Sequence, residues 1–227
     1  MKSYFKLSKL LCVLGLLFLF SCEDDGHFIV SDWNSNNESK PIIFYISGDG
    51  GFNTFSQSMG KDLHNLGYDV FALDTKDYFW QNKTPHEASE DTEKFLKKIV
   101  RHRDNKQIIL IGYSYGAEVA PFIYNRFDDD FKENIKKLIV INPTAVNDFK
   151  IHVDEYVFKP VRYGYSVVKE VNQLGNLPFT LVVSDDELNA FPRDKITLKS
   201  YEYMHLAGSH DFSGNTKMVV DSISKYF

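Results

Sequence analysis

Short apolar runs alternate with longer segments of helical periodicity along most of the chain. Residues 108–111 are four consecutive aliphatic residues, a pattern typical of a strand that is buried on both faces of a sheet. Strands are expected at residues 41–46, 68–73, 108–111, 137–141, 179–183 and 196–204, and helices at residues 55–66, 85–102, 117–127 and 216–227. Because strands alternate with helices and crossovers are right-handed, we expect a doubly wound, mainly parallel sheet in a three-layer αβα sandwich.

The N-terminal part of the chain does not follow this alternation. Lys2, Lys6 and Lys9 precede a short apolar run at residues 10–20, which is typical of a secretory signal. Ser21-Cys22 follows the run and resembles a bacterial lipobox, in which Cys22 is acylated, although an ordinary cleaved signal fits too. We therefore expect a lipoprotein signal peptide at residues 1–21, a polar, flexible tether at 22–40 and one folded domain at 41–227.

Composition narrows the possible partners. The net charge is −5 and no basic cluster stands out, so nucleic-acid binding is not expected. Both cysteines, Cys12 and Cys22, lie in the N-terminal region, so the domain has no internal disulfide and no cysteine cluster for a metal. The glycine-rich segment at 47–51 lacks the Lys-Ser/Thr of a phosphate-binding loop and the spacing of a dinucleotide fingerprint. No metal and no cofactor is expected.

One motif in the chain indicates covalent catalysis. Gly112-Tyr113-Ser114-Tyr115-Gly116 lies between a buried strand and a helical pattern, the strand–turn–helix context of a nucleophile elbow. This context predicts an α/β-hydrolase-type fold with the Ser114 hydroxyl exposed above the sheet. A chance G-x-S-x-G at an ordinary turn is the alternative.

Such hydrolases need an acid and then a histidine, in that chain order. His205 and His210 both follow the last expected strand, and we prefer His210 because small residues flank it. Asp185, Asp186 and Glu187 follow the preceding strand; Glu187 has the better spacing, with Asp186 nearly as good.

Two further groups of residues are candidates for the site. The N–H of Tyr115 and an N–H from Gly50 to Phe52, at Gly51 or Phe52, are expected to form the oxyanion hole. Three adjacent aromatics, Tyr78-Phe79-Trp80, cannot all face one core, so some are expected to line or cover a site. Residues 148–177 are irregular and are expected to form an insert near the site.

Several motifs resemble the bacterial virulence protein family VirJ/AcvB. Ser47-Gly48-Asp49-Gly50-Gly51-Phe52 is similar to its S-G-D-G-G-W, and Tyr78-Phe79-Trp80 with Lys83-Thr84-Pro85 is similar to its Y-F-W-x-x-K-T-P. Gly112 to Val119 resembles its G-Y-S-F-G-A-D-V, residues 121–126 match its P-F-x-Y-N-R, and residues 208–212 resemble its G-G-H-H-F. The chain departs from the family pattern at Ser184, Asn189 and Asp211.

The resemblance implies an α/β-hydrolase fold, export to the periplasm and hydrolysis of the aminoacyl ester, chiefly lysyl, of phosphatidylglycerol. Contacts with such a substrate are expected from Asp49, Tyr78, Trp80 and Lys83, by their charge or aromatic character: Lys83 would meet the phosphodiester, and Asp49 or Asp77 an ammonium. Ordinary surface charge is the alternative for Lys83 and Asp77.

Three functional hypotheses follow. The first is a serine esterase of an aminoacylated phospholipid, anchored by lipid in the cell envelope of a Gram-negative-type bacterium. The second is a general carboxylesterase or small lipase. The third is a periplasmic binding or secretion-associated protein that kept the fold without the chemistry.

Overall fold

The computed structural model describes residues 30–151 and 164–227 of the chain. The strands of this part are β1 (Val30–Trp33), β2 (Ile42–Ile46), β3 (Val70–Leu73), β4 (Ile108–Tyr113), β5 (Ile135–Ile141), β6 (Val146–Asn147), β7 (Tyr165–Ser166), β8 (Phe179–Ser184) and β9 (Glu202–Leu206). The α-helices are α1 (Thr54–Asn65), α2 (Thr75–Tyr78), α3 (Pro85–Val100), α4 (Tyr115–Asn125), α5 (Asp129–Lys132), α6 (Val167–Val171) and α7 (Thr216–Ile223). Short 3₁₀ helices are η2 (Asp185–Glu187), η3 (Arg193–Lys195), η4 (Phe212–Gly214) and η5 (Ser224–Tyr226).

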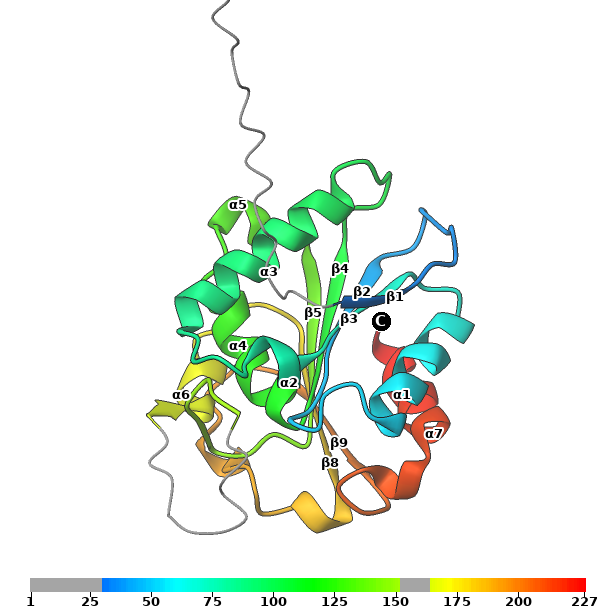
Figure 1. Cartoon of the computed structure of the whole chain (residues 1–227). Helices are drawn as coiled ribbons and strands as arrows, with labels where there is room; N and C mark the ends of the chain where they lie inside the picture. Colours follow the sequence, from blue (N-terminus) through cyan, green and yellow to red (C-terminus); the bar gives the residue numbers. More distant parts are fainter. Residues whose placement is uncertain (1–29, 152–163) are drawn as a thin grey trace, which may run out of the picture.

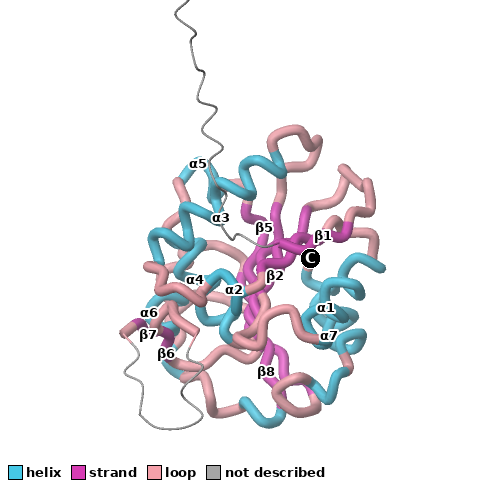
Figure 2. The backbone as a smooth tube through the Cα atoms, in the orientation of Figure 1, coloured by secondary structure: helices cyan, strands magenta, loops and turns pink. Residues whose placement is uncertain are grey.

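Seven strands form one twisted sheet in the order β1-β3-β2-β4-β5-β8-β9 (Figure 1). All pairs in it are parallel except β1 with β3, which is antiparallel. Helices α1 and α7 cover one face, and α3, α4 and α6 cover the other (Figure 2). The predicted doubly wound, three-layer αβα architecture is confirmed.

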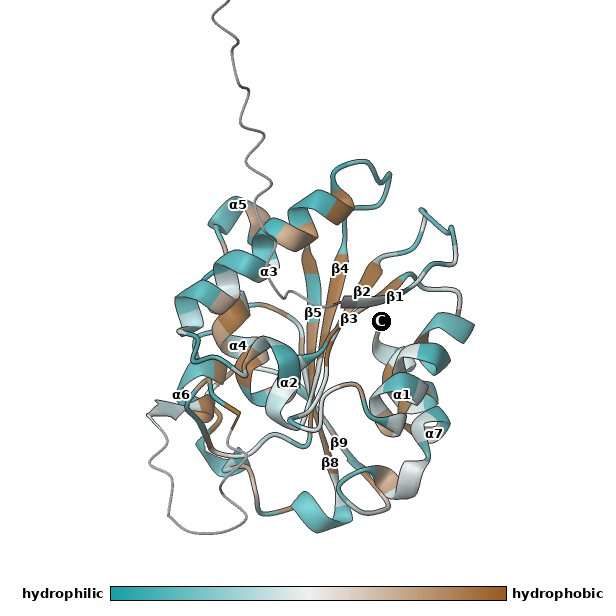
Figure 3. Ribbon diagram, viewed as in Figure 1, coloured by the Kyte–Doolittle hydropathy of each residue, from teal (hydrophilic) through white to brown (hydrophobic). Residues whose placement is uncertain are grey.

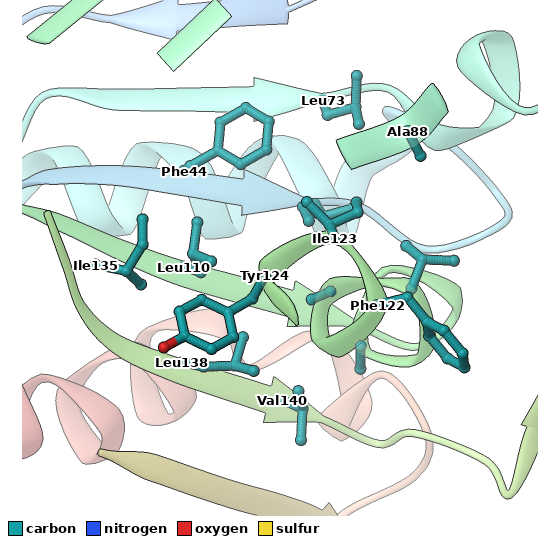
Figure 4. Packing of buried hydrophobic residues seen from close by; sticks show 14 of the residues in the cluster. Phe44, Leu73, Ala88, Leu110, Phe122, Ile123, Tyr124, Ile135, Leu138 and Val140 are labelled. Atoms are coloured by element: carbon teal, nitrogen blue, oxygen red, sulfur yellow. The ribbon is translucent and has the colours of Figure 1, made fainter. Parts of the chain in front are cut away.

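β2 and the first four residues of β4 are apolar throughout because both of their faces are covered. Successive side chains of β2 point to opposite faces. Ile42 and Phe44 join the core under α3 and α4, whereas Ile43 and Tyr45 join the core under α1 and α7. The strands are accordingly the most hydrophobic part of the ribbon, and polar residues concentrate on the outer faces of the helices (Figure 3). Phe44, Leu110 and Leu138 lie on neighbouring strands beneath Ile123 and Tyr124 of α4 (Figure 4).

The N-terminus of α3 shows the expected capping box. The Thr84 N–H donates to Glu87 Oε2 at 2.7 Å, and the Glu87 N–H donates to Thr84 Oγ1 at 3.2 Å. Pro85 occupies the first turn, where its missing N–H costs nothing. The K-T-P part of the family-like motif therefore begins a helix.

The expected tether overlaps the folded domain. Val30 to Trp33 forms β1 and extends the sheet beside β3, so the expectation of a flexible tether up to Lys40 is wrong for this part. Asp69, which is almost completely buried, accepts hydrogen bonds from the N–H of Ser35 and from Arg103, and Arg103 also donates to Asn37 O. These bonds attach residues 35–37 to the sheet. The expected signal peptide, Cys22 and residues 23–29 lie outside the described residues.

One predicted strand is shorter than expected. Residues 196–204 alternate in polarity, but only the part from Glu202 onward pairs with β8. Ile196 and Leu198 do point inward, against the core under α6. Their backbone is held by the Asn172 side chain instead of a strand, because Asn172 accepts from Thr197 N and donates to Lys195 O. The alternation of apolar and polar residues at 196–201 therefore comes from a loop that packs inward, and not from a strand.

The expected insert at residues 148–177 contains β7 and α6, and α6 packs against α4. Residues 152–163 of this insert lie outside the described part. Within the described residues, no helix is both long enough and apolar enough to cross a bilayer.

The first turn of α4 approaches the end of β2 closely enough to require glycine. A Cβ on Gly116 would lie 2.1 Å from Ile46 O and 2.4 Å from Ser47 O, both backbone atoms. We expect Gly116→Ala to lower the free energy of unfolding by about 2 kcal/mol or more, because the helix must move off the sheet. Urea denaturation measures this. Gly164→Ala is the control, since among the described residues no atom beyond its chain neighbours lies within 4 Å of its added Cβ; an equal effect in both variants would contradict the packing argument.

Candidate active site

Ser114 lies at the sharp turn between β4 and α4. Its backbone has φ 52° and ψ −121°, an unusual conformation for a residue other than glycine, and its N–H donates to Ile141 O at 2.8 Å. A Cβ on Gly112 would lie 2.3 Å from Gly116 O, so the tight turn requires glycine at that position. Strain of this kind costs about 1–3 kcal/mol and clusters at functional sites. The geometry is that of the predicted strand–turn–helix elbow.

His210 reaches Ser114 from the loop that follows β9. His210 Nε2 lies 2.9 Å from Ser114 Oγ, and His210 Nδ1 lies 2.7 Å from Glu187 Oε1. Ser114, Glu187 and His210 follow β4, β8 and β9, so all three lie at the carboxyl edge of the parallel sheet. We call this edge the catalytic edge. The hydroxyl, imidazole and carboxylate form one hydrogen-bonded chain in the order expected of a serine nucleophile, its base and the orienting acid.

The three consecutive acidic residues form the 3₁₀ helix η2, so their side chains point in different directions. Glu187 contacts His210. Asp186 is exposed and does not contact the imidazole, so its place among the catalytic candidates is wrong. Asp185 instead accepts from His205 Nε2 at 2.7 Å and from Gly208 N at 2.9 Å. These two donors, the Gly208 N–H first, hold the pKa of Asp185 below its ordinary value. His205 therefore fixes the histidine loop rather than contacting the serine.

Asn142 holds the His210 loop from beneath. It is fully buried, directly after β5, with φ 52°. Its Nδ2 donates to His210 O at 2.7 Å and to Ser184 Oγ at 3.0 Å, and its Oδ1 accepts from Ser184 N at 2.7 Å. The Tyr113 hydroxyl also donates to His210 O, at 3.2 Å. Asn142 was not among the residues expected at the site; its only signal in the sequence is a polar residue directly after a buried strand.

The oxyanion-hole expectation is partly wrong. Tyr115 begins α4, where a backbone N–H has no acceptor within the helix, so it is retained as a donor. The N–H groups of Gly51 and Phe52 are already used: Gly51 donates to Gly48 O at 2.9 Å and Phe52 to Asp74 Oδ2 at 3.1 Å. They are not available to a substrate oxyanion.

The Gly48–Asp49 peptide provides a better second donor. Gly48 O accepts hydrogen bonds from the Thr75 hydroxyl and from Gly51 N, both on the β3 side of β2. Because C=O and N–H point in opposite directions in a trans peptide, the Asp49 N–H points toward β4. A Cβ on Gly48 would lie 3.3 Å from Ser114 Cβ, so this peptide lies beside the nucleophile. Among the described residues the Asp49 N–H has no acceptor, which leaves it free for a substrate oxygen.

The expected substrate contacts fall into two groups. Tyr78 and Lys83 form a cluster with Asp91 of α3: the Tyr78 hydroxyl donates to Asp91 Oδ2 at 2.6 Å, and Lys83 Nζ lies 3.2 Å from the same oxygen and over the Tyr78 ring. Burial, and then Asp91, raise the pKa of Tyr78. The positive charge of Lys83 is therefore already paired with the carboxylate of Asp91. Asp49 and Trp80, by contrast, are exposed near the catalytic edge, and Asp77 is exposed on α2.

A buried carboxylate lies in α4, one turn beyond the nucleophile. Glu118 accepts from Thr144 N, from the Thr144 hydroxyl at 2.6 Å and from Asn147 Nδ2 at 2.6 Å. Burial raises the pKa of Glu118, although the three donors act in the opposite direction. The nearby Tyr115 hydroxyl is buried without a hydrogen-bond partner in the described part of the chain. Burial, and then the charges of Asp148, Glu118 and Asp49, raise the pKa of Tyr115.

A parallel sheet between two helical layers, with serine, acid and histidine in this order at its carboxyl edge, defines an α/β-hydrolase. Residues 41–226 match the family described as "Bacterial virulence protein (VirJ)", and the chain belongs to this family. The expected resemblance is thereby confirmed. A comparison with curated proteins found no match.

Solved structures of the same fold include esterases and a phospholipase. A lipase-esterase related protein from Clostridium acetobutylicum superposes with a TM-score of 0.63 at 15% identity, over 88% of this chain and 100% of that chain. Est1E from Butyrivibrio proteoclasticus, with ferulic acid bound, gives 0.62 at 14% identity, over 87% and 93%. A membrane phospholipase A described as a bacterial virulence factor gives 0.60 at 14% identity, over 86% and 81%. At these identities the likeness shows the fold.

The role of Asn142 can be tested with an isosteric change. Asn142→Asp keeps the shape but replaces the donor facing His210 O with an acceptor, which costs about 1–3 kcal/mol and displaces the imidazole. We expect kcat on a soluble ester to fall about tenfold or more, with KM little changed. Asn172→Asp is the matched control, because this amide also bridges two segments, away from the catalytic edge. It should leave kcat within about twofold; equal losses of kcat would contradict the positioning role.

The raised pKa of Glu118 predicts a pH dependence of stability. Above the ordinary carboxyl value of 4.5 the folded state holds this proton more tightly than the unfolded state. The free energy of unfolding contributed by Glu118 therefore falls as the pH rises from about 4.5 toward the folded-state value. Urea denaturation between pH 4.5 and 7 should show this fall in the wild type and not in Glu118→Gln. The exposed Glu133→Gln is the control for loss of a carboxylate; if it also removes the fall, the assignment to Glu118 is wrong.

Proposed function

We propose that the protein is a serine hydrolase that cleaves carboxylic esters through an acyl-enzyme. The observation that supports this most directly is the hydrogen-bonded chain from Ser114 Oγ through His210 to Glu187, with distances of 2.9 and 2.7 Å. Glu187 accepts from Nδ1, which leaves Nε2 free of a proton and facing the serine hydroxyl. Histidine can then act as the general base.

The geometry supports the following sequence. His210 Nε2 takes the proton of Ser114 as Oγ attacks the ester carbonyl carbon. The negative charge that develops on the carbonyl oxygen is stabilised by the N–H groups of Tyr115 and Asp49, at the N-terminus of α4 and beside it. The C–O bond of the ester then breaks, and the alcohol leaves with the proton from His210. Water, deprotonated by the same imidazole, attacks the acyl-enzyme and releases the acid, which restores Ser114.

We further propose that the substrate is the aminoacyl, chiefly lysyl, ester of phosphatidylglycerol. The family-like motifs favour this substrate, and so does the charge near Tyr115. The charged groups that raise the pKa of Tyr115 after burial are Asp148, Glu118 and Asp49, all acidic. An aminoacyl ester carries an ammonium group next to its reacting carbonyl, and such a cation is favoured among carboxylates. Lys83 is already paired with Asp91, so the expected contact between Lys83 and the phosphodiester is not part of this proposal.

A general carboxylesterase or small lipase is the second candidate. The fold is shared with an esterase that binds ferulic acid and with a phospholipase, which supports a range of ester substrates for this architecture. The expected Cys22 lipid anchor places either enzyme in the cell envelope, and we propose that location for the protein.

The proposal is tested by removing each member of the triad. Ser114→Ala should lower the release of lysine from lysyl-phosphatidylglycerol vesicles by about 10⁴-fold or more, and Glu187→Gln should have a large effect as well. Asp186→Asn is the matched control for Glu187→Gln, because it removes the adjacent exposed carboxylate. It should retain activity within about twofold.

The three functional hypotheses give different results. Lysine release that needs Ser114 supports the aminoacyl-lipid esterase. Hydrolysis of p-nitrophenyl butyrate without lysine release identifies a general esterase. Failure of a fluorophosphonate probe to label Ser114 in the folded protein would contradict the enzymatic proposal altogether.

A further inference from the structure

Large apolar side chains are exposed around the catalytic edge. Leu188 follows Glu187 after β8, Trp80 follows β3 through α2, and Val146 follows β5. Tyr165 lies on β7, which pairs with β6 at Val146 and Asn147. Because the carboxyl ends of parallel strands share one edge of the sheet, these residues emerge on the same side as Ser114. We call Trp80, Val146, Tyr165 and Leu188 the apolar rim; Trp80 is the most exposed of them at 57%.

The described part of the chain also begins at the catalytic edge. β1 is antiparallel to β3, and its first residue, Val30, lies opposite Leu73, the last residue of β3. Leu73 pairs with Ile46 of β2, and Ile46 pairs with Gly112 of β4. Val30 is therefore in the same row as Gly112, three strand spacings of about 4.8 Å away. The chain enters the domain about 14 Å from the strand that carries the nucleophile.

The expected lipid anchor at Cys22 would keep the domain close to the bilayer surface. Cys22 precedes Val30 by eight residues, and a polypeptide spans at most about 3.6 Å per residue. Lipid on Cys22 thus holds Val30 within about 29 Å of the bilayer whatever conformation these residues adopt. An anchor of this length, attached at the catalytic edge, favours orientations that turn this edge toward the lipid.

We propose that the apolar rim docks on the surface of a lipid bilayer and places the Ser114 hydroxyl at the interface. The proposal rests on the proposed function for the lipid nature of the substrate. Tryptophan and tyrosine favour the headgroup region of bilayers, and leucine and valine favour the acyl boundary beneath it. Asp49, Asp186 and Asp211 are exposed at the same edge. They disfavour a strongly anionic surface and favour one whose headgroups have been made cationic by an aminoacyl ester.

The two tryptophans of the chain allow a direct test. Trp33 is partly buried and its ring stacks on Phe52, whereas Trp80 belongs to the rim and is exposed. The full-length lipidated protein is reconstituted in vesicles that contain phospholipids with brominated acyl chains. Ser114→Ala is present throughout, so that no substrate lipid is consumed. Trp33→Phe leaves only Trp80 to emit, and Trp80→Phe leaves only Trp33.

We expect brominated lipid to quench Trp80 at least twofold more strongly than Trp33. Equal or weaker quenching of Trp80 would overturn the proposal. Because the readout does not involve turnover, failure of the esterase assay with persistent quenching of Trp80 would reject the proposed function and leave the docking surface intact.

A second pair of variants separates docking by the rim from proximity through the anchor alone. Val146→Asp combined with Leu188→Asp, in the Trp33→Phe and Ser114→Ala background, should reduce quenching of Trp80 at least twofold. Tyr226→Asp is the matched control, since this exposed tyrosine lies in η5 at the C-terminus, outside the rim. Quenching that survives the double change would show that the anchor alone brings Trp80 to the lipid, and would overturn the role of the rim.

Discussion

The site depends on a hydrogen bond between groups on strands that do not touch. Ser114 follows β4 and His210 follows β9, with β5 and β8 between them in the sheet. Each intervening strand contributes one buried polar residue at its carboxyl end, Asn142 after β5 and Ser184 at the end of β8. Asn142 bonds to Ser184 and to His210 O, so the backbone that carries the imidazole is fixed relative to the strands it spans. A buried amide whose nitrogen and oxygen are both hydrogen-bonded is held in one orientation, and this helps to keep 2.9 Å between imidazole and hydroxyl.

Local sequence patterns predicted the αβα fold and the residues of the triad. They did not predict the hydrogen bonds between distant segments that hold the triad in place. Ser114, Glu187 and His210 follow from chain order and from strands whose ends meet at one edge. The role of Asn142 depends on a residue 68 positions away, and no periodicity reports such a contact. The Asp49 N–H was missed because the direction of one peptide is set by Thr75, 27 residues from Gly48. Residues 30–33 lie outside the regular alternation, yet pairing with β3 orders them.

The most distinctive motif of the sequence proved largely architectural. Tyr78 and Lys83 converge on Asp91, which connects the segment after β3 to α3, and Thr84 caps that helix. Phe79 is completely buried and contacts the ring of Tyr115, the residue after the nucleophile. The Y-F-W-x-x-K-T-P motif therefore stabilises the protein structure beside the active site, whether or not it also contacts a substrate. Of the three aromatic residues in the motif, Trp80 is the one that faces solvent.

The pairing of β1 also closes one side of the sheet. Without it, β3 would present Val70 to Leu73, an apolar strand whose outer N–H and C=O groups have no partner. A bare edge of this kind is a template for intermolecular strand addition. A polypeptide shortened to begin at Pro41, where the regular alternation of strands and helices starts, would keep the triad and expose that edge. Self-association, rather than loss of chemistry, would be its first defect.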